Sequence, residues 1–133
     1  MYPLKHIISS LIFCIILFPF IGYNVITVYL AAVFIDTDHW LFYVFKEKDY
    51  SFKSFRKSYY YGKAHKSKDA LHILHVVEFW ILIAILSFFY KLFFFIYIGI
   101  IFHLYLDIIY LWLYPEFKDA RTYSLITWLY RNI

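Results

Sequence analysis

The segment that decides the fold reads Leu92-Phe-Phe-Phe-Ile-Tyr-Ile-Gly-Ile-Ile-Phe-His103-Leu-Tyr-Leu-Asp107-Ile-Ile-Tyr-Leu-Trp-Leu-Tyr114. Of its 23 residues, all except His103 and Asp107 are apolar or aromatic. A helix needs about 20 such residues to cross the hydrocarbon core of a bilayer, and Pro115 directly follows and would end it. The segment therefore predicts a membrane-spanning helix at 92–114 that carries two ionisable side chains.

The composition of the whole chain agrees with this reading. Of 133 residues, 64% are hydrophobic and 17% are charged, against roughly 45–50% and about 25% in soluble domains. This length allows one domain, so we expect residues 1–133 to form a single membrane-embedded unit. The one cysteine, Cys14, excludes an intrachain disulfide and a thiolate metal cluster.

A second long apolar block occupies residues 7–35 and is interrupted by Pro19, Gly22 and Asn24. It is too long for one straight span and too short for two full ones. It predicts either one kinked helix or two membrane helices at 7–22 and 23–45. The grouping of Pro, Gly and Asn favours the hinged pair.

Two further segments complete the expected fold. Residues 70–90 are apolar enough for another membrane helix. Residues 119–131 predict an amphipathic, interfacial helix, because Tyr123, Ile126 and Tyr130 share one helical face. The fold class is therefore all-α: an integral membrane helical bundle of three to four membrane helices with interfacial helices beside them.

The basic residues are concentrated between the apolar blocks. Eight of the thirteen lie in the segment 46–69, which predicts a cytoplasmic loop by the positive-inside rule. Anionic lipid headgroups are its expected partners, and the membrane context argues against nucleic acid. The 70–90 helix then runs outward and the 92–114 helix returns, which gives a multi-pass protein of the cell membrane with a cytoplasmic C-terminus.

Ionisable residues inside membrane helices cost roughly 2.5–3.5 kcal/mol each, and they usually have a function. Here they form three clusters, all on the expected cytoplasmic half of the bundle. The candidate metal ligands are Asp36, Asp38 and His39; His72, His75 and Glu78; and His103 and Asp107. Together they predict one buried metal site, with the interhelical hydrogen bond as the alternative reading of each residue.

Spacing distinguishes the roles of these residues. His103 and Asp107 are four apart and share a helical face. His72, His75 and Glu78 step by three, so on a helix they drift by about 60° per step and can line a pocket without all reaching one ion. Asp38 points away from Asp36 and His39 unless the helix unwinds there.

Imidazole and carboxylate ligands suit zinc, manganese or iron better than calcium. Zinc is our first expectation, as one or two ions, since eight candidate ligands exceed the need of one. The expected direct ligands are Asp36, His39, His75, His103 and Asp107. Glu78 or Asp38 would act as bridging ligand or general base. His6 and His65 lie among basic residues and are expected to face water.

The motif Asp36-Thr-Asp38-His39 and the motif Gly99-Ile-Ile-Phe-His103-Leu-Tyr-Leu-Asp107 resemble the D-x-D-H and G-x-x-x-H-x-x-x-D signatures of a family of membrane-bound, metal-dependent hydrolases. This family is described as LexA-binding, inner-membrane-associated hydrolases and is distantly similar to zinc-dependent phospholipase C. The likeness covers residues 25 to 115. Where the family has H-R-x-x-T-H-S, this chain has Leu71-His72-Ile-Leu-His75-Val-Val-Glu78.

The resemblance implies metal-assisted hydrolysis, and the expected substrate is a phosphoester of a lipid or a lipid-linked molecule. Three other functions fit the same ligand types. A di-iron redox enzyme would carry them on facing helices, although its usual Glu-x-x-His order is reversed here. A metal-ion or proton transporter would use them as a pathway. A non-enzymatic scaffold would use the metal only to hold its helices together.

Overall fold

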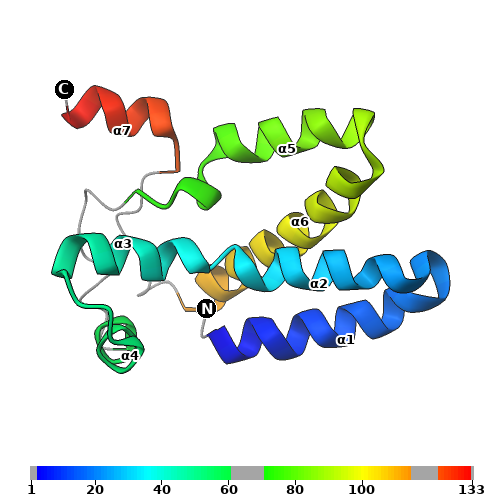
Figure 1. The fold of residues 1–133 in the computed structure, drawn as a ribbon, viewed down its shortest axis with the longest axis horizontal. Coiled ribbons are helices and arrows are strands. Elements are labelled where there is room, and N and C mark those ends of the chain that lie inside the picture. Colours follow the sequence, from blue (N-terminus) through cyan, green and yellow to red (C-terminus); the bar gives the residue numbers. More distant parts are fainter. Residues whose placement is uncertain (1–2, 61–70, 115–122, 133) are drawn as a thin grey trace. The chain divides into compact units, whose positions relative to one another are not determined.

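Figure 1 shows the computed structural model of the chain, which describes residues 3–60, 71–114 and 123–132. Every regular element in these residues is helical. The α-helices are α1 (Pro3–Ile21), α2 (Val25–Phe34), α3 (Thr37–Glu47), α4 (Phe52–Tyr60), α5 (Val77–Phe89), α6 (Lys91–Leu113) and α7 (Leu125–Asn132), and the short 3-10 turns are η1 (Gly22–Asn24) and η2 (Ile73–His75). The all-α prediction is confirmed for this part of the chain.

The contacts divide the chain into two compact units. Unit 1 comprises Met1–Ile35 and Trp80–Lys118, and unit 2 comprises Asp36–Phe79 and Asp119–Ile133. The sequence predicted one domain from its length of 133 residues.

In unit 1, α1 and α2 form a helical hairpin (Figure 1). The chain reverses in η1, where Gly22 has a φ of +56°, a conformation that costs other residues more than glycine. The side chain of Asn24 donates to the carbonyl of Ile21 at 2.8 Å. The hinge therefore lies at Gly22–Asn24, within the segment in which the sequence predicted it.

Close packing of α6 on α2 determines the geometry of unit 1. A Cβ atom at Gly99 would lie 2.4 Å from the carbonyl oxygen of Val28 and 2.9 Å from the Cβ of Ala31. Only glycine fits there, so the two backbones approach as small-residue interfaces do in membranes. This approach brings the next turn of α6, which carries His103, against the end of α2.

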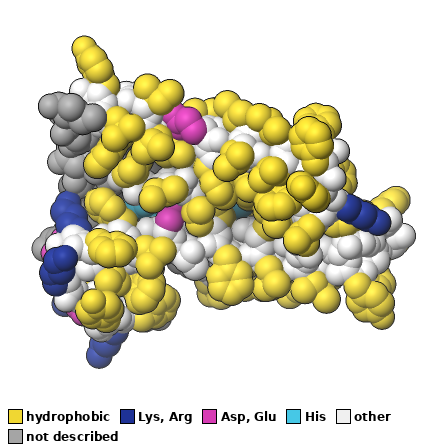
Figure 2. All heavy atoms as spheres, turned by 45° about the horizontal axis from the view of Figure 1, so that its top comes forward, with side chains coloured by type: hydrophobic (Ala, Val, Ile, Leu, Met, Phe, Trp, Pro, Cys, Tyr) yellow, Lys and Arg dark blue, Asp and Glu magenta, His cyan; other side chains and the backbone are white. Residues whose placement is uncertain are grey.

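The outward faces of unit 1 are apolar. Ile15 on α1 and Ile108 and Trp112 on α6 are each more than half exposed, and hydrophobic side chains cover much of the face drawn in Figure 2. Soluble monomers rarely expose continuous apolar patches of this kind. By length and composition, two helical stretches are apolar enough to cross a membrane: Leu4–Glu47, which comprises α1, η1, α2 and α3, and Lys91–Leu113, which is α6.

In unit 2, α3 ends at Glu47, and the residue that follows, Lys48, has the left-handed conformation (φ 55°) typical of a helix C-terminus. Asp49 follows and accepts a hydrogen bond from the backbone N–H of Ser51 at 2.7 Å, just before α4. This bond is the largest of the interactions that lower the pKa of the Asp49 carboxyl. Phe55 of α4 is buried and packs on Tyr43 of α3.

The segment before α5 differs from the prediction of a continuous helix over 70–90. His72 is extended, with φ −104° and ψ 95°, Val76 is also extended, and α5 begins only at Val77. The backbone N–H of Leu74 donates to Asp38 at 3.0 Å, which takes it out of a helical hydrogen-bond ladder. The prediction that His72, His75 and Glu78 lie on one continuous helix was therefore wrong.

Helix α7 begins at Leu125, within the predicted 119–131 segment; residues 119–122 lie outside the described part. Its N-terminus is held by Glu78, which accepts hydrogen bonds from the Ser124 hydroxyl at 2.6 Å and from the N–H groups of Leu125 and Ile126 at 3.0 and 3.3 Å. A carboxylate stabilises a helix N-terminus by satisfying these donors and by its charge.

Candidate metal centre

Unit 2 collects five buried or largely buried ligand-type side chains. Asp36 lies at the N-cap position of α3, and Asp38 and His39 lie in its first turn. His72 and His75 come from the non-helical segment before α5. Two overlapping groups could each hold a metal ion: Asp36 with His39 and His75, and Asp38 with His39 and His72.

Asp38 fixes the orientation of His75. One of its oxygens, Oδ2, lies 3.0 Å from Nδ1 of His75 and also accepts from the Leu74 N–H. A carboxylate only accepts hydrogen bonds, so Nδ1 of His75 carries the proton. In the neutral ring, Nε2 of His75 then presents a lone pair, which is the form that binds metals.

That lone pair faces Asp36. Nε2 of His75 lies 3.8 Å from Oδ1 of Asp36, and Nε2 of His39 lies 3.5 Å from the same oxygen. A tetrahedral zinc ion with bonds of about 2.0–2.1 Å separates its ligand atoms by roughly 3.4 Å. These two distances therefore fit an ion shared by Asp36, His39 and His75.

His72 supports His39. Its Nε2 lies 3.2 Å from Nδ1 of His39, so one of these two nitrogens donates to the other. If Nε2 of His39 binds an ion, Nδ1 of His39 is the donor and His72 accepts. His72 then holds a ligand in place.

Unit 1 holds the pair on α6. His103 and Asp107 are both buried and share a helical face, as their spacing predicted. Nδ1 of His103 lies 2.7 Å from the carbonyl oxygen of Ala32 and therefore donates to it. Nε2 of His103 faces Oδ2 of Asp107 at 3.7 Å.

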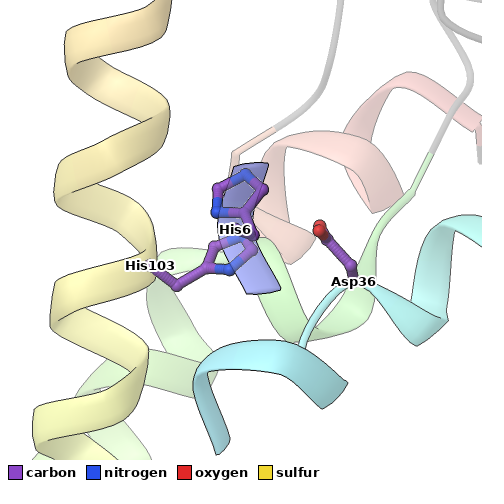
Figure 3. A group of neighbouring side chains, drawn as sticks. All are labelled: His6, Asp36 and His103. Atoms are coloured by element: carbon purple, nitrogen blue, oxygen red, sulfur yellow. The ribbon is translucent and has the colours of Figure 1, made fainter. Parts of the chain in front are cut away.

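His6 belongs to this second group, which corrects the expectation that it faces water. It is 1% exposed, and its Nε2–H donates to Oδ1 of Asp107 at 3.1 Å. Its ring stacks on that of His103, with centroids 4.0 Å apart, and Figure 3 shows the two rings beside each other. The sequence held one signal: His6 and Ser10 are four residues apart, a spacing that places two polar side chains on the same helical face.

Glu78 is placed differently from its predicted role as ligand or base. It belongs to neither metal-competent group of unit 2, and its two oxygens cap α7 instead. The reason is the late start of α5, which leaves Glu78 in its first turn. His65 lies outside the described residues. The predicted gathering of residues from both units around one centre stays a prediction.

The buried histidines and aspartates thus form groups that could hold a metal ion. Comparison with protein-family models, with curated proteins and with solved structures finds no match to this chain.

Proposed function

We propose that this protein is a membrane-embedded, metal-dependent hydrolase that acts on a phosphoester of a lipid or lipid-linked substrate. One observation carries the proposal. In His39, His75 and His103, Nδ1 is hydrogen-bonded, while Nε2 faces an aspartate oxygen at 3.5 to 3.8 Å.

This arrangement is typical of metal ligands. A histidine that binds a metal usually donates its other N–H to a carboxylate or a backbone carbonyl, which fixes its tautomer. In the neutral rings of His75 and His103 the nitrogen lone pair and the facing carboxylate oxygen are both acceptors, so a cation placed between them is attracted to both. Burial strengthens that attraction.

The donor set supports zinc, with manganese or iron as the alternatives. When bound, such an ion lowers the pKa of a coordinated water toward about 7 and polarises a phosphoryl oxygen. Asp36, His39 and His75 hold the ion of unit 2. Asp38 keeps His75 in its binding tautomer and is the candidate general base of this unit.

The apolar surfaces support a multi-pass arrangement in the membrane. We propose α1 and α6 as full spans and α2 and α5 as shorter membrane helices, with the 46–69 segment and the C-terminus in the cytoplasm. Four lysines of α3, α4 and the turn between them are exposed beside exposed Tyr50 and Phe52; they are Lys46, Lys48, Lys53 and Lys57. This combination suits anionic headgroups, including the phosphate of the substrate.

The orientation is tested by labelling intact cells at introduced cysteines. Ser54→Cys is expected to react only after the membrane is permeabilised, and Tyr90→Cys from outside. The native Cys14 is buried, so it gives a low background. Labelling of Ser54→Cys from outside would overturn the topology and leave the metal site untouched.

The function is tested on protein purified in mild detergent without chelators. Metal analysis is expected to find about one or two zinc-type ions per chain, and hydrolysis of a phosphatidic acid or a lipid-linked pyrophosphate is expected to stop on chelation. His75→Ala should lose the ion of unit 2 and the hydrolysis. The control is Asp49→Asn, because Asp49 is an acidic residue that bonds to Ser51 and not to the histidines. This variant should keep its metal and its hydrolysis. A metal-free, fully folded wild-type protein would overturn the proposal.

A further inference from the structure

His6 is not one of the proposed metal ligands, although it is among the most deeply buried of the described residues. It lies in the second turn of α1, 101 residues away in sequence from Asp107, with which it forms a hydrogen bond. An imidazole is costly to bury in an apolar helix pair. Its position in unit 1 therefore needs a reason.

The two oxygens of Asp107 contact different histidines. Oδ1 accepts from Nε2 of His6 at 3.1 Å, and Oδ2 faces Nε2 of His103 at 3.7 Å. The first distance is that of a hydrogen bond. The second leaves room for a cation between the two atoms. His6 thus occupies one oxygen and leaves the other turned toward the lone pair of His103.

Ring geometry argues against His6 as a second ligand of the same ion. The imidazole planes of His6 and His103 are stacked, only 11° from parallel, with centroids 4.0 Å apart. A histidine binds a metal along a lone pair that lies in the plane of its ring. Lone pairs in two parallel, stacked planes do not converge on one point about 2 Å from both nitrogens.

We infer that His6 is a positioning residue for the His103–Asp107 pair: its N–H fixes the rotation of the Asp107 carboxylate, and its ring packs against the ring of His103. This inference rests on the proposed metal-binding function and extends it to α1. The ligand is a divalent cation of the zinc type. His6 acts on it through Asp107 and does not contact it.

Two substitutions separate the donor from the ring. His6→Phe keeps an aromatic ring on His103 but removes the N–H, and His6→Gln keeps an N–H near the position of Nε2. Ser10→Ala, one turn further along α1 and also fully buried, is the matched control. Zinc affinity is measured by competition with a chromophoric chelator, on full-length protein in detergent whose helicity and elution volume match the wild type.

We expect His6→Phe to weaken zinc binding about 10- to 100-fold, the usual effect of losing an outer hydrogen bond to a ligand. His6→Gln should recover most of this loss, and Ser10→Ala should bind like the wild type. If all three variants bound zinc as tightly as the wild type, the inference would be overturned and the proposed function would be unaffected. Equal, complete loss in His6→Phe and His6→Gln would also overturn it, because it would make His6 a ligand. A wild-type protein that binds no zinc would overturn the proposed function itself.

Discussion

Units 1 and 2 hold their histidines in the same manner but present them from different local structures. In unit 1, His103 and Asp107 lie one turn apart on a regular helix, and a backbone carbonyl fixes the tautomer of His103. In unit 2, His75 lies in an irregular segment, and a side chain, Asp38, fixes its tautomer. The backbone acceptor of His103 is therefore retained after most substitutions, whereas the side-chain acceptor of His75 can be removed by a single one.

The largest expected effect is common to both units. Asp36→Asn and Asp107→Asn keep the shape of the side chain but reduce its charge, so each should lose bound metal and phosphoester hydrolysis. Each should also melt, in detergent, at a lower temperature than the metal-loaded wild type, because a bound ion no longer links the ligand side chains. Metal analysis and a thermal melt check this. If Asp107→Asn kept its metal and its activity, an interhelical hydrogen bond would explain unit 1 better.

The second prediction separates the units. Asp38→Ala removes the acceptor of His75 and should lower zinc affinity about 10- to 100-fold, while Asp38→Asn, which retains an acceptor oxygen, should lower it less. The counterpart in unit 1 is Ala32→Gly, which preserves the carbonyl and should bind zinc within a few-fold of wild type. Chelator competition measures all three. Comparable losses in Asp38→Ala and Ala32→Gly would contradict the distinction.

The third prediction concerns the packing that brings His103 to Ala32. Gly99→Ala places a Cβ 2.4 Å from a backbone carbonyl, so α2 and α6 must separate, at a cost of roughly 1–3 kcal/mol. The melting temperature and zinc affinity should both fall. Gly22→Ala is the control. The φ of +56° strains an alanine there by about 1 kcal/mol, but no described atom lies near the added Cβ. The zinc affinity of Gly22→Ala should therefore equal that of the wild type. Unchanged affinity in Gly99→Ala would show that His103 does not depend on this approach.

The smallest expected effect tests Glu78. Glu78→Gln weakens the capping of α7, worth about 1 kcal/mol, and should increase amide exchange at Leu125 and Ile126. It should leave the metal content unchanged, because the Glu78 oxygens bond to α7. A loss of metal in Glu78→Gln would restore the ligand role expected from the sequence.

Regular helices made part of this structure predictable. The shared face of His103 and Asp107 follows from a spacing of four residues, and the hinge follows from Gly22 and Asn24. Asp38 was expected to point away from the cluster, but the N–H of Leu74 and the ring of His75 both bond to it. Because the Leu74 N–H bonds to a side chain and not to a helical carbonyl, the segment before α5 is not helical. The prediction for His72 and Glu78 had assumed helical periodicity there.

His6 could not be predicted for a different reason. Its partner lies 101 residues away, and local periodicity says nothing about contacts at that distance. Charged neighbours such as Lys5 also suggested a place near water. Only the antiparallel course of α1 and α2, which returns the chain to its starting end, brings the first turns of α1 near the carbonyl of Ala32.

The separation between His6 and Asp107 also orders the steps of biosynthesis. At about 5–20 residues per second, Asp107 is synthesised roughly 5–20 s after His6. During that interval α1 and α2 have been synthesised, including His6 and Ala32, but the His103 and Asp107 turns of α6 have not. Unit 1 can therefore complete its fold only after α6 has been synthesised. Any delay in synthesis between α2 and α6 prolongs the period in which cellular quality control can recognise the chain as unfinished.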